Sequence, residues 1–165
     1  MIVYIVRHGT AVDRTDPDAP PDPERPLTRK GIEKTRAAMH GLREQDIKPS
    51  VLITSPFLRA AQTAEIAAET LGYPRDKIQR TNALVPSAEP VELWRELLKL
   101  KSKSVMCFGH APNVDLVIAS ALGSRTMITS LKKSGVACLE MDSVSPPKGH
   151  LLWLMQPKML RKLGG

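Results

Sequence analysis

The stretch Met1-Ile-Val-Tyr-Ile-Val-Arg-His-Gly-Thr10 opens with an unbroken run of β-branched and aromatic residues from Ile2 to Val6. Such a run predicts a strand that is buried on both faces, as in a parallel sheet covered by helices. Arg7, His8 and Gly9 follow at once, and a cation and an imidazole at the end of a buried strand are costly to desolvate. Open α/β sheets build their sites at this carboxyl edge. The tripeptide is therefore a candidate site, the alternative being that both side chains simply extend into solvent.

Strand and helix patterns alternate along the rest of the chain. Further buried strands are predicted at residues 51–54 and 105–108, with a weaker one at 78–80. Apolar residues at helical spacing predict helices over residues 28–42, 55–71, 89–98 and 112–122. A terminal hairpin is predicted from residues 135–140 and 150–155.

This alternation predicts an α/β fold, a three-layer α/β/α sandwich on a mostly parallel sheet with antiparallel strands at one edge. We expect one domain over residues 1–165, since no internal repeat is present. The helix at 55–71 is expected to begin with Ser55 as its N-cap. The helix at 89–98 is expected to bury Val91, Trp94, Leu97 and Leu98.

The composition is that of an ordinary globular protein, with 42% hydrophobic and 25% charged residues. No run approaches the about 20 apolar residues of a membrane span, so we expect a cytoplasmic protein without membrane contact. Cys107 and Cys138 lie in apolar runs and predict reduced core thiols, with a disulfide as the alternative. The net charge of +7 suits an anionic partner. Because only 4% of residues are aromatic, stacking on nucleic acid is disfavoured and phosphate is the better candidate.

The segment from Asp13 to Pro26 is rich in proline and shows no periodicity, so it predicts a loop. A loop of this length is usually functional or disordered. Because it leaves the corner formed by Arg7, His8 and Gly9, we expect it to form a rim or lid over that corner.

Arg7, His8, Arg59 and His110 all follow the ends of predicted strands. In a parallel sheet these ends meet at one edge, so the four side chains are expected to meet there. Guanidinium groups bind phosphate oxygens bidentately, and neighbouring cations lower the pKa of a histidine and keep it neutral. We therefore predict a phosphoryl site in which His8 is a nucleophile that forms a transient phosphohistidine.

Arg59 carries separate information, because it falls in the first turn of its predicted helix. A cation there opposes the helix dipole by about 0.3–1 kcal/mol. A local rule broken without local gain indicates a functional residue. The alternative is a surface arginine paired with Glu65 or another acid.

Other phosphatase chemistries fit poorly. Neither cysteine is followed by the arginine that closes a cysteine-phosphatase loop, and the first strand ends in Arg-His rather than in an aspartate nucleophile. Four histidines without clustered carboxylates give little basis for a two-metal site. No metal is therefore expected.

These motifs resemble the histidine phosphatase superfamily, whose fold is shared with phosphoglycerate mutases and acid phosphatases. Arg7-His8-Gly9 is similar to the family signature, Ser55 to Arg59 to its second arginine motif, and Gly109-His110 to its second histidine. The chain most resembles the short SixA-type phosphohistidine phosphatases, through residues 25–28, 55–63 and 153–160. The resemblance spans nearly the whole chain.

The resemblance implies that His8 accepts the phosphoryl group, that Arg7, Arg59 and His110 bind it, and that no metal or cofactor is required. Relatives carry a carboxylate general acid in the segment that holds Glu89 here, yet a carboxylate that starts a helix is also ordinary N-terminal chemistry. A weak or absent acid disfavours alkyl phosphoesters, whose alkoxide must be protonated. It tolerates phosphohistidine, because a protonated imidazole leaves as a neutral ring.

We therefore expect a metal-independent phosphatase that removes the phosphoryl group from protein phosphohistidine, with inorganic phosphate as product and a phosphorelay domain as one candidate partner. One alternative is a small-molecule phosphomonoesterase of the same superfamily. Another is a non-catalytic module that uses its positive charge to bind phosphate or RNA.

Overall fold

The computed structural model describes all residues, 1–165. At its centre lies a six-stranded sheet of order β3-β2-β4-β1-β5-β6. The first four strands in this order run parallel to one another. At the other edge β5 pairs antiparallel with β1, and β6 pairs antiparallel with β5. The strands are β1 (Ile2–Arg7), β2 (Val51–Thr54), β3 (Gln79–Arg80), β4 (Ser104–Gly109), β5 (Val136–Val144) and β6 (Pro147–Met155).

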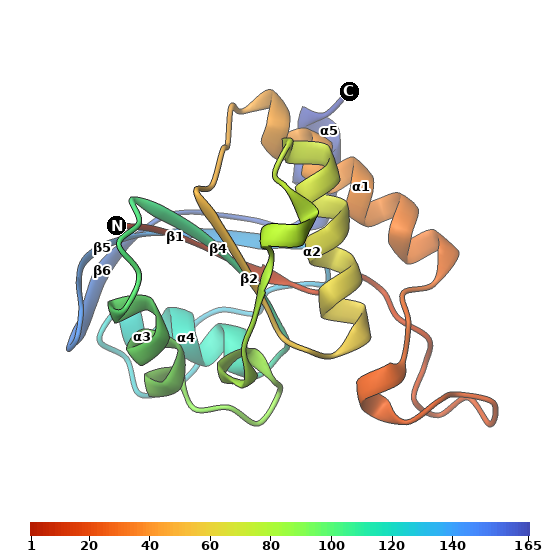
Figure 1. Cartoon of the computed structure of the whole chain (residues 1–165), viewed down its shortest axis with the longest axis horizontal. Helices are drawn as coiled ribbons and strands as arrows, with labels where there is room; N and C mark the ends of the chain where they lie inside the picture. The colour runs from red at the N-terminus through yellow and green to blue at the C-terminus, as the bar shows by residue number, and fades with distance from the viewer.

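Helices cover both faces of this sheet (Figure 1). They are α1 (Arg29–Glu44), α2 (Leu58–Leu71), α3 (Pro90–Leu98), α4 (Asn113–Ala121) and α5 (Pro157–Leu163). One face packs against α1, α2 and α5, and the other against α3 and α4. Along β1 the side chains alternate between the two cores, with Tyr4 and Val6 facing the first group and Val3 and Ile5 the second. The predicted three-layer α/β/α sandwich is confirmed.

The start of α2 differs from the prediction. The helix begins at Leu58 with Phe57 as N-cap, so the prediction that Ser55 caps it is wrong. The Ser55 hydroxyl accepts a hydrogen bond from the Phe57 N–H at 3.2 Å, which forms a tight turn ahead of the helix. Because this turn follows β2 directly, Ser55 stays at the edge of the sheet.

The inward face of α3 is narrower than predicted. Leu93, Trp94 and Leu97 are buried, whereas Val91 is 48% and Leu98 59% exposed. A helix of nine residues presents only one stripe to the sheet, and these two residues lie beside that stripe. The prediction that Val91 and Leu98 face inward is wrong.

The two cysteines are free and buried in the cores, as predicted. Burial raises the pKa of the Cys107 thiol to about 12, so this side chain behaves as an inert apolar residue. None of the helices combines the length and apolar character needed to cross a membrane.

Helix α5 is absent from the sequence-based prediction. Pro157 occupies its first turn, where proline is favoured, but seven residues give too short a pattern to recognise. The helix packs on α1 at Gly41, where a Cβ atom would come within 2.0 Å of the Leu160 carbonyl oxygen. The Leu160 side chain is fully buried in the core beneath. Close packing therefore joins the end of the chain to α1.

We predict that Leu160→Ala lowers the free energy of unfolding by about 2–5 kcal/mol, because it leaves a cavity between α5 and α1. Leu163→Ala makes the same change in the same helix at a position that is 38% exposed, and we expect a loss below about 1 kcal/mol. Urea unfolding of both variants measures the difference. Equal losses would show that α5 does not dock as described.

Candidate active site

The register of the parallel strands brings three strand ends together. Arg7 pairs with Gly109 across β1 and β4, and Thr54 of β2 pairs with Phe108 of β4. The ladder continues one residue further, because the His8 N–H donates to the Gly109 carbonyl at 3.0 Å and the Ser55 N–H donates to the Phe108 carbonyl at 2.9 Å. The residues that follow each strand therefore share one edge of the sheet.

A cavity of about 720 Å³ opens at this edge, and Arg7, His8, Arg59 and His110 all line it. The structure thus brings the four predicted site residues together. Two carboxylates, those of Asp13 and Asp22, also face the cavity. The cationic side chains in the lining outnumber them: Arg7, Arg14, Arg25, Arg59 and Lys133. This excess of positive charge suits an anionic ligand.

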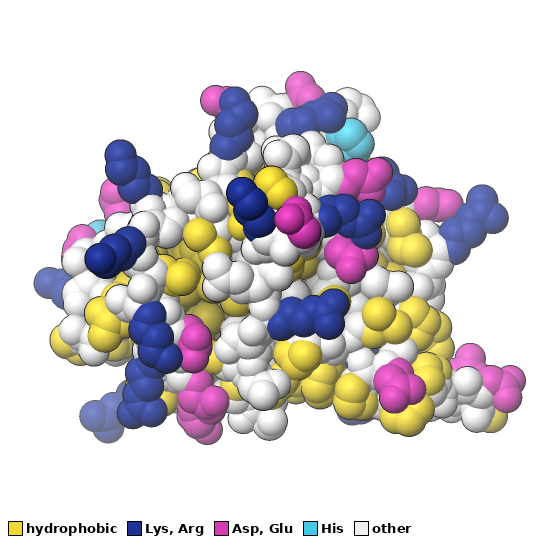
Figure 2. Space-filling model, viewed as in Figure 1, with side chains coloured by type: hydrophobic (Ala, Val, Ile, Leu, Met, Phe, Trp, Pro, Cys, Tyr) yellow, Lys and Arg dark blue, Asp and Glu magenta, His cyan; other side chains and the backbone are white.

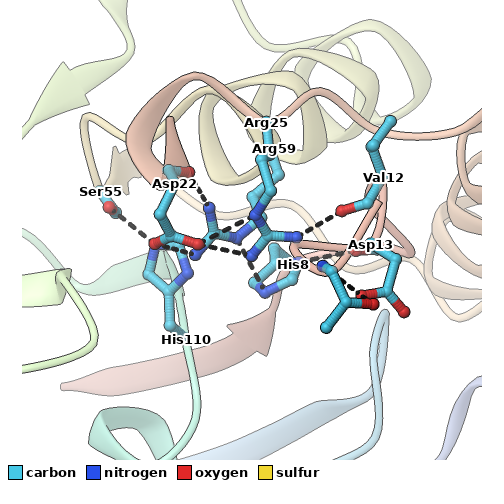
Figure 3. Close-up of polar contacts among 10 residues, drawn as sticks. His8, Val12, Asp13, Asp22, Arg25, Ser55, Arg59 and His110 are labelled. Carbon is cyan, nitrogen blue, oxygen red and sulfur yellow. Dashed lines mark hydrogen bonds and ion pairs between the residues drawn. The ribbon is translucent and has the colours of Figure 1, made fainter. Parts of the chain in front are cut away.

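The hydrogen bonds of His8 define its tautomer (Figure 3). Nδ1 lies 2.6 Å from the carbonyl oxygen of Gly9. Because a carbonyl oxygen can only accept, Nδ1 carries the proton and Nε2 carries the lone pair. The Arg59 Nε–H donates to Nε2 at 3.3 Å, so the lone pair faces the arginine.

The environment of His8 keeps its imidazole neutral. Burial, together with the charges of Arg59, Arg7 and Lys133, lowers its pKa to about 3 against the opposing hydrogen bond to Gly9. The side chain is 7% exposed. At neutral pH the Nε2 lone pair is therefore available as a nucleophile.

His110 lies beside His8, with ring centroids 4.9 Å apart. Burial, with smaller contributions from the neighbouring His8 and Arg59, lowers its pKa to about 2. Its Nε2 lies 2.9 Å from the Ser55 hydroxyl, and the Phe57 ring packs edge-on against it at 5.1 Å. The turn between β2 and α2 therefore positions this second imidazole.

Arg59 contacts the rim of the cavity. Its Nη1 donates to the Asp22 carbonyl at 2.6 Å, and its Nη2 lies 3.2 Å from the Asp22 carboxylate (Figure 3). Arg25 binds the same carboxylate at 2.7 Å. Partial burial raises the pKa of Asp22, but the hydrogen bonds and charges of Arg25 and Arg59 outweigh it and hold the pKa below its usual value. The alternative of a surface arginine paired with Glu65 or another acid holds only for the acid, which is Asp22. Glu65 pairs instead with Arg75 at 2.7 Å, and Arg59 is buried rather than at the surface.

The segment that carries Asp22 is the proline-rich loop of the sequence analysis. A short 3-10 helix interrupts it at Asp22–Glu24. Asp13, Arg14, Asp22 and Arg25 all come from this loop and line the cavity. The loop therefore forms one wall of the site, as a rim.

Arg7 and Gly9 are fixed by close packing around the corner. Arg7 Nη1 donates to the Leu131 carbonyl at 2.8 Å, while its buried Nε has no protein partner. A Cβ atom on Gly9 would lie 2.3 Å from the Thr35 hydroxyl of α1. The Gly9 N–H donates to the Thr63 hydroxyl of α2 at 3.0 Å. The corner thus requires glycine because two helices close on it.

Glu89 is not brought to this cavity. It is exposed at the start of α3, where its N–H donates to the Glu92 carboxylate at 3.0 Å. Sequence reasoning also missed the placement of Asp22, Ser55 and Lys133 in or beside the site. For Ser55 a signal existed, since it lies between a strand end and Arg59; for Asp22 no pattern pointed inward.

Residues 3–84 match the family described as histidine phosphatase superfamily (branch 1). The chain is 30% identical to the phosphohistidine phosphatase SixA of Escherichia coli over 166 residues, which covers 98% of this chain and 97% of SixA. The chain belongs to the histidine phosphatase superfamily. It is also 32% identical to an uncharacterized protein of Picosynechococcus, over 97% of this chain and 99% of that protein.

A solved structure of the protein histidine phosphatase SixA complexed with tungstate superposes with a TM-score of 0.85 and 29% identity, covering 97% of this chain and 99% of that one. The predicted fold and family are confirmed. The relationship identifies the protein as a phosphatase, so the alternative of a non-catalytic module is wrong.

The lowered histidine pKa values predict acid sensitivity. A group whose folded pKa lies below its unfolded value of about 6.5 stabilises the fold above that pH, and the contribution is lost as pH falls from about 6.5 toward about 3. We expect each buried histidine to add up to about 1.4 kcal/mol per pH unit to this loss. Denaturant unfolding between pH 7.5 and 4.5 measures it.

In that series His8→Asn should weaken the fall of the unfolding free energy with decreasing pH, because it removes one of the two buried imidazoles. His150→Gln removes an imidazole whose side chain is 65% exposed and is the control for the loss of a surface histidine. An identical slope in His8→Asn and the unmodified protein would contradict a buried neutral His8.

The Asp22 carboxylate occupies hydrogen-bond donors of Arg59 that an oxyanion would use. We predict that Asp22→Asn tightens the binding of inorganic phosphate or tungstate, because it removes a negative charge that competes with the anion for Arg59 and repels it. Between two unit negative charges about 4 Å apart this repulsion is about 1 kcal/mol at the dielectric of water, or roughly fivefold in Kd. Isothermal titration calorimetry gives the value. Glu24→Gln, an exposed carboxylate of the same 3-10 helix, is the control and should not change Kd; weaker binding in Asp22→Asn would contradict the competition.

Proposed function

We propose that this phosphatase is metal-independent and removes the phosphoryl group from a histidine side chain of a partner protein. The observation that carries the proposal is the tautomer of His8. Its Nδ1–H is held by the Gly9 carbonyl, and its Nε2 carries a lone pair that accepts a long hydrogen bond from Arg59 and would be released to attack when Arg59 turns to the phosphoryl oxygens. An imidazole in this state, buried and neutral, can attack phosphorus without first losing a proton.

In the proposed first step, His8 Nε2 attacks phosphorus and the bond between phosphorus and the substrate imidazole breaks. The bonding electrons leave with that imidazole, which departs neutral when its other nitrogen is protonated. In the second step water attacks phosphorus, the bond to Nε2 breaks, and phosphate and free His8 are released. Arg7, Arg59 and His110 line the cavity around His8 and would stabilise the charge on the transferred oxygens.

The ionised state of the carboxylates in the cavity favours phosphohistidine over an alkyl phosphoester as the substrate. Asp22 is held ionised by Arg25 and Arg59. Hydrogen bonds from the backbone and side chain of Thr15 likewise lower the pKa of Asp13. Glu89 lies outside the lining. A departing alkoxide would therefore find no carboxylic acid to protonate it, whereas a departing imidazole does not need one.

We further propose which class of protein carries the phosphohistidine. The similarity to SixA, named for phosphohistidine, supports a protein substrate such as a phosphorelay domain. The free, buried cysteines are consistent with the reducing cytoplasm. We infer a role in cytoplasmic signal transduction.

Rapid quenching of the enzyme during turnover of a ³²P-labelled phosphohistidine peptide tests the mechanism. We expect label on the protein that is stable to alkali and lost in acid, and peptide mapping should place it on His8. His8→Ala should abolish both label and turnover. His40→Ala, which removes a histidine of α1 that does not line the cavity, should retain both.

Two outcomes would contradict the proposal in different ways. Label elsewhere, or turnover that survives His8→Ala, would remove His8 as the nucleophile. A higher kcat/KM for sugar or nucleotide monophosphates than for phosphohistidine would instead favour the small-molecule phosphomonoesterase.

A further inference from the structure

A second concave surface adjoins the catalytic cavity. This basic groove has a volume of about 420 Å³ and no aromatic or aliphatic side chain in its lining other than that of Pro157. Its side chains come from β1, α1, α5 and the loop before β5. Six of them are cationic, and none is acidic: Arg7, Lys34, Lys132, Lys133, Lys158 and Arg161.

The cations of the basic groove are not neutralised by the protein. None of the six takes part in any ion pair of the structure. By contrast, on the face shown in Figure 2, Lys and Arg side chains are interspersed with Asp and Glu. Burial lowers the pKa of Lys133, and the charges of Arg7 and Arg25 act in the same direction against the opposing charge of Asp13, which forms no ion pair with it. Unpaired like charges held this closely repel one another, so the groove gains from an anionic partner.

The basic groove is continuous with the catalytic cavity. Arg7, Thr10 and Lys133 line both. A ligand whose phosphoryl group lies against Arg7 can therefore extend into the groove without leaving the protein surface. An extended peptide advances about 3.3–3.6 Å per residue, so side chains two to four positions from the phosphorylated residue would lie within reach.

We propose that the basic groove binds a carboxylate-rich segment of the polypeptide that carries the phosphohistidine. The inference rests on the proposed function and adds a specificity surface to it. Charge complementarity favours this occupant, because Lys side chains on a flexible stem pair readily with Asp and Glu. The absence of any aromatic side chain from the lining disfavours single-stranded nucleic acid, which needs stacking surfaces.

Two synthetic phosphohistidine peptides test the proposal. In one, Asp and Glu occupy the positions two to four residues from the phosphohistidine on each side; in the other, Ser and Gln replace them. We expect kcat/KM to be at least about tenfold higher for the acidic peptide at low ionic strength. The preference should shrink as salt rises, because exposed charges are screened over about 10 Å at 0.1 M.

Lys34→Glu/Lys158→Glu reverses two exposed charges of the basic groove that lie outside the catalytic cavity. It should reduce the acidic preference to about onefold or below and leave turnover of the neutral peptide unchanged. Lys101→Glu/Lys103→Glu makes the same charge change at exposed positions just before β4, at the opposite end of that strand from the site. This control should keep the preference.

The outcomes separate the two proposals. If the unmodified enzyme hydrolyses both peptides but the acidic preference is absent, or survives in Lys34→Glu/Lys158→Glu, the groove proposal is overturned and the proposed function stands. If neither peptide is hydrolysed, the proposed function fails and the groove proposal fails with it. A groove variant that loses turnover of a sugar bisphosphate rather than of the acidic peptide would assign the groove to a second phosphate and overturn the proposal.

Discussion

The structure depends on placing positive charge at the end of a buried sheet without protonating the imidazoles beside it. Arg7 and Arg59 are tied to backbone carbonyl groups, those of Leu131 and Asp22, which partly replace their hydration. Burial and these same charges hold His8 and His110 neutral. Each feature supports the other, since a protonated imidazole would repel the guanidinium groups. The result is a cavity lined mainly by cations, with two uncharged imidazoles among them.

Much of this arrangement could be predicted because it follows from strand register. The run from Ile2 to Val6 predicts a buried strand. Parallel pairing then places the residues that follow β1, β2 and β4 at the same carboxyl edge of the sheet. Arg59 was identifiable because it opposes the dipole of its own helix. These signals are local in sequence, and the parallel topology converts them into a site. No knowledge of side-chain contacts was needed.

What could not be predicted depends on contacts between distant segments. Asp22 reaches Arg59 because a proline-rich loop folds back over α2, and nothing periodic marks that loop. Helix α5 is short, and it can dock on α1 only because Gly41 has no Cβ atom. Ser55 was expected to cap a helix, yet its hydroxyl holds His110. Glu89 was in the right segment for an acid, but capping of α3 keeps it at the helix end.

The chemistry of the cavity and the selection of a partner are separate problems. A neutral imidazole among cations, with Asp13 and Asp22 held ionised, suits a bond whose leaving group needs no acid. Under the proposed function the cavity would select for the phosphorus–nitrogen bond but not for the protein that carries it. Recognition of that protein must therefore come from surface outside the cavity. The basic groove is continuous with the cavity through Arg7 and Lys133 and is not neutralised by the protein's own acids, so it is placed to supply that recognition. Under the proposed function the need for positive charge at the sheet edge extends beyond catalysis, because Arg7, which would bind the phosphoryl group, also lines the basic groove that would read the sequence around it.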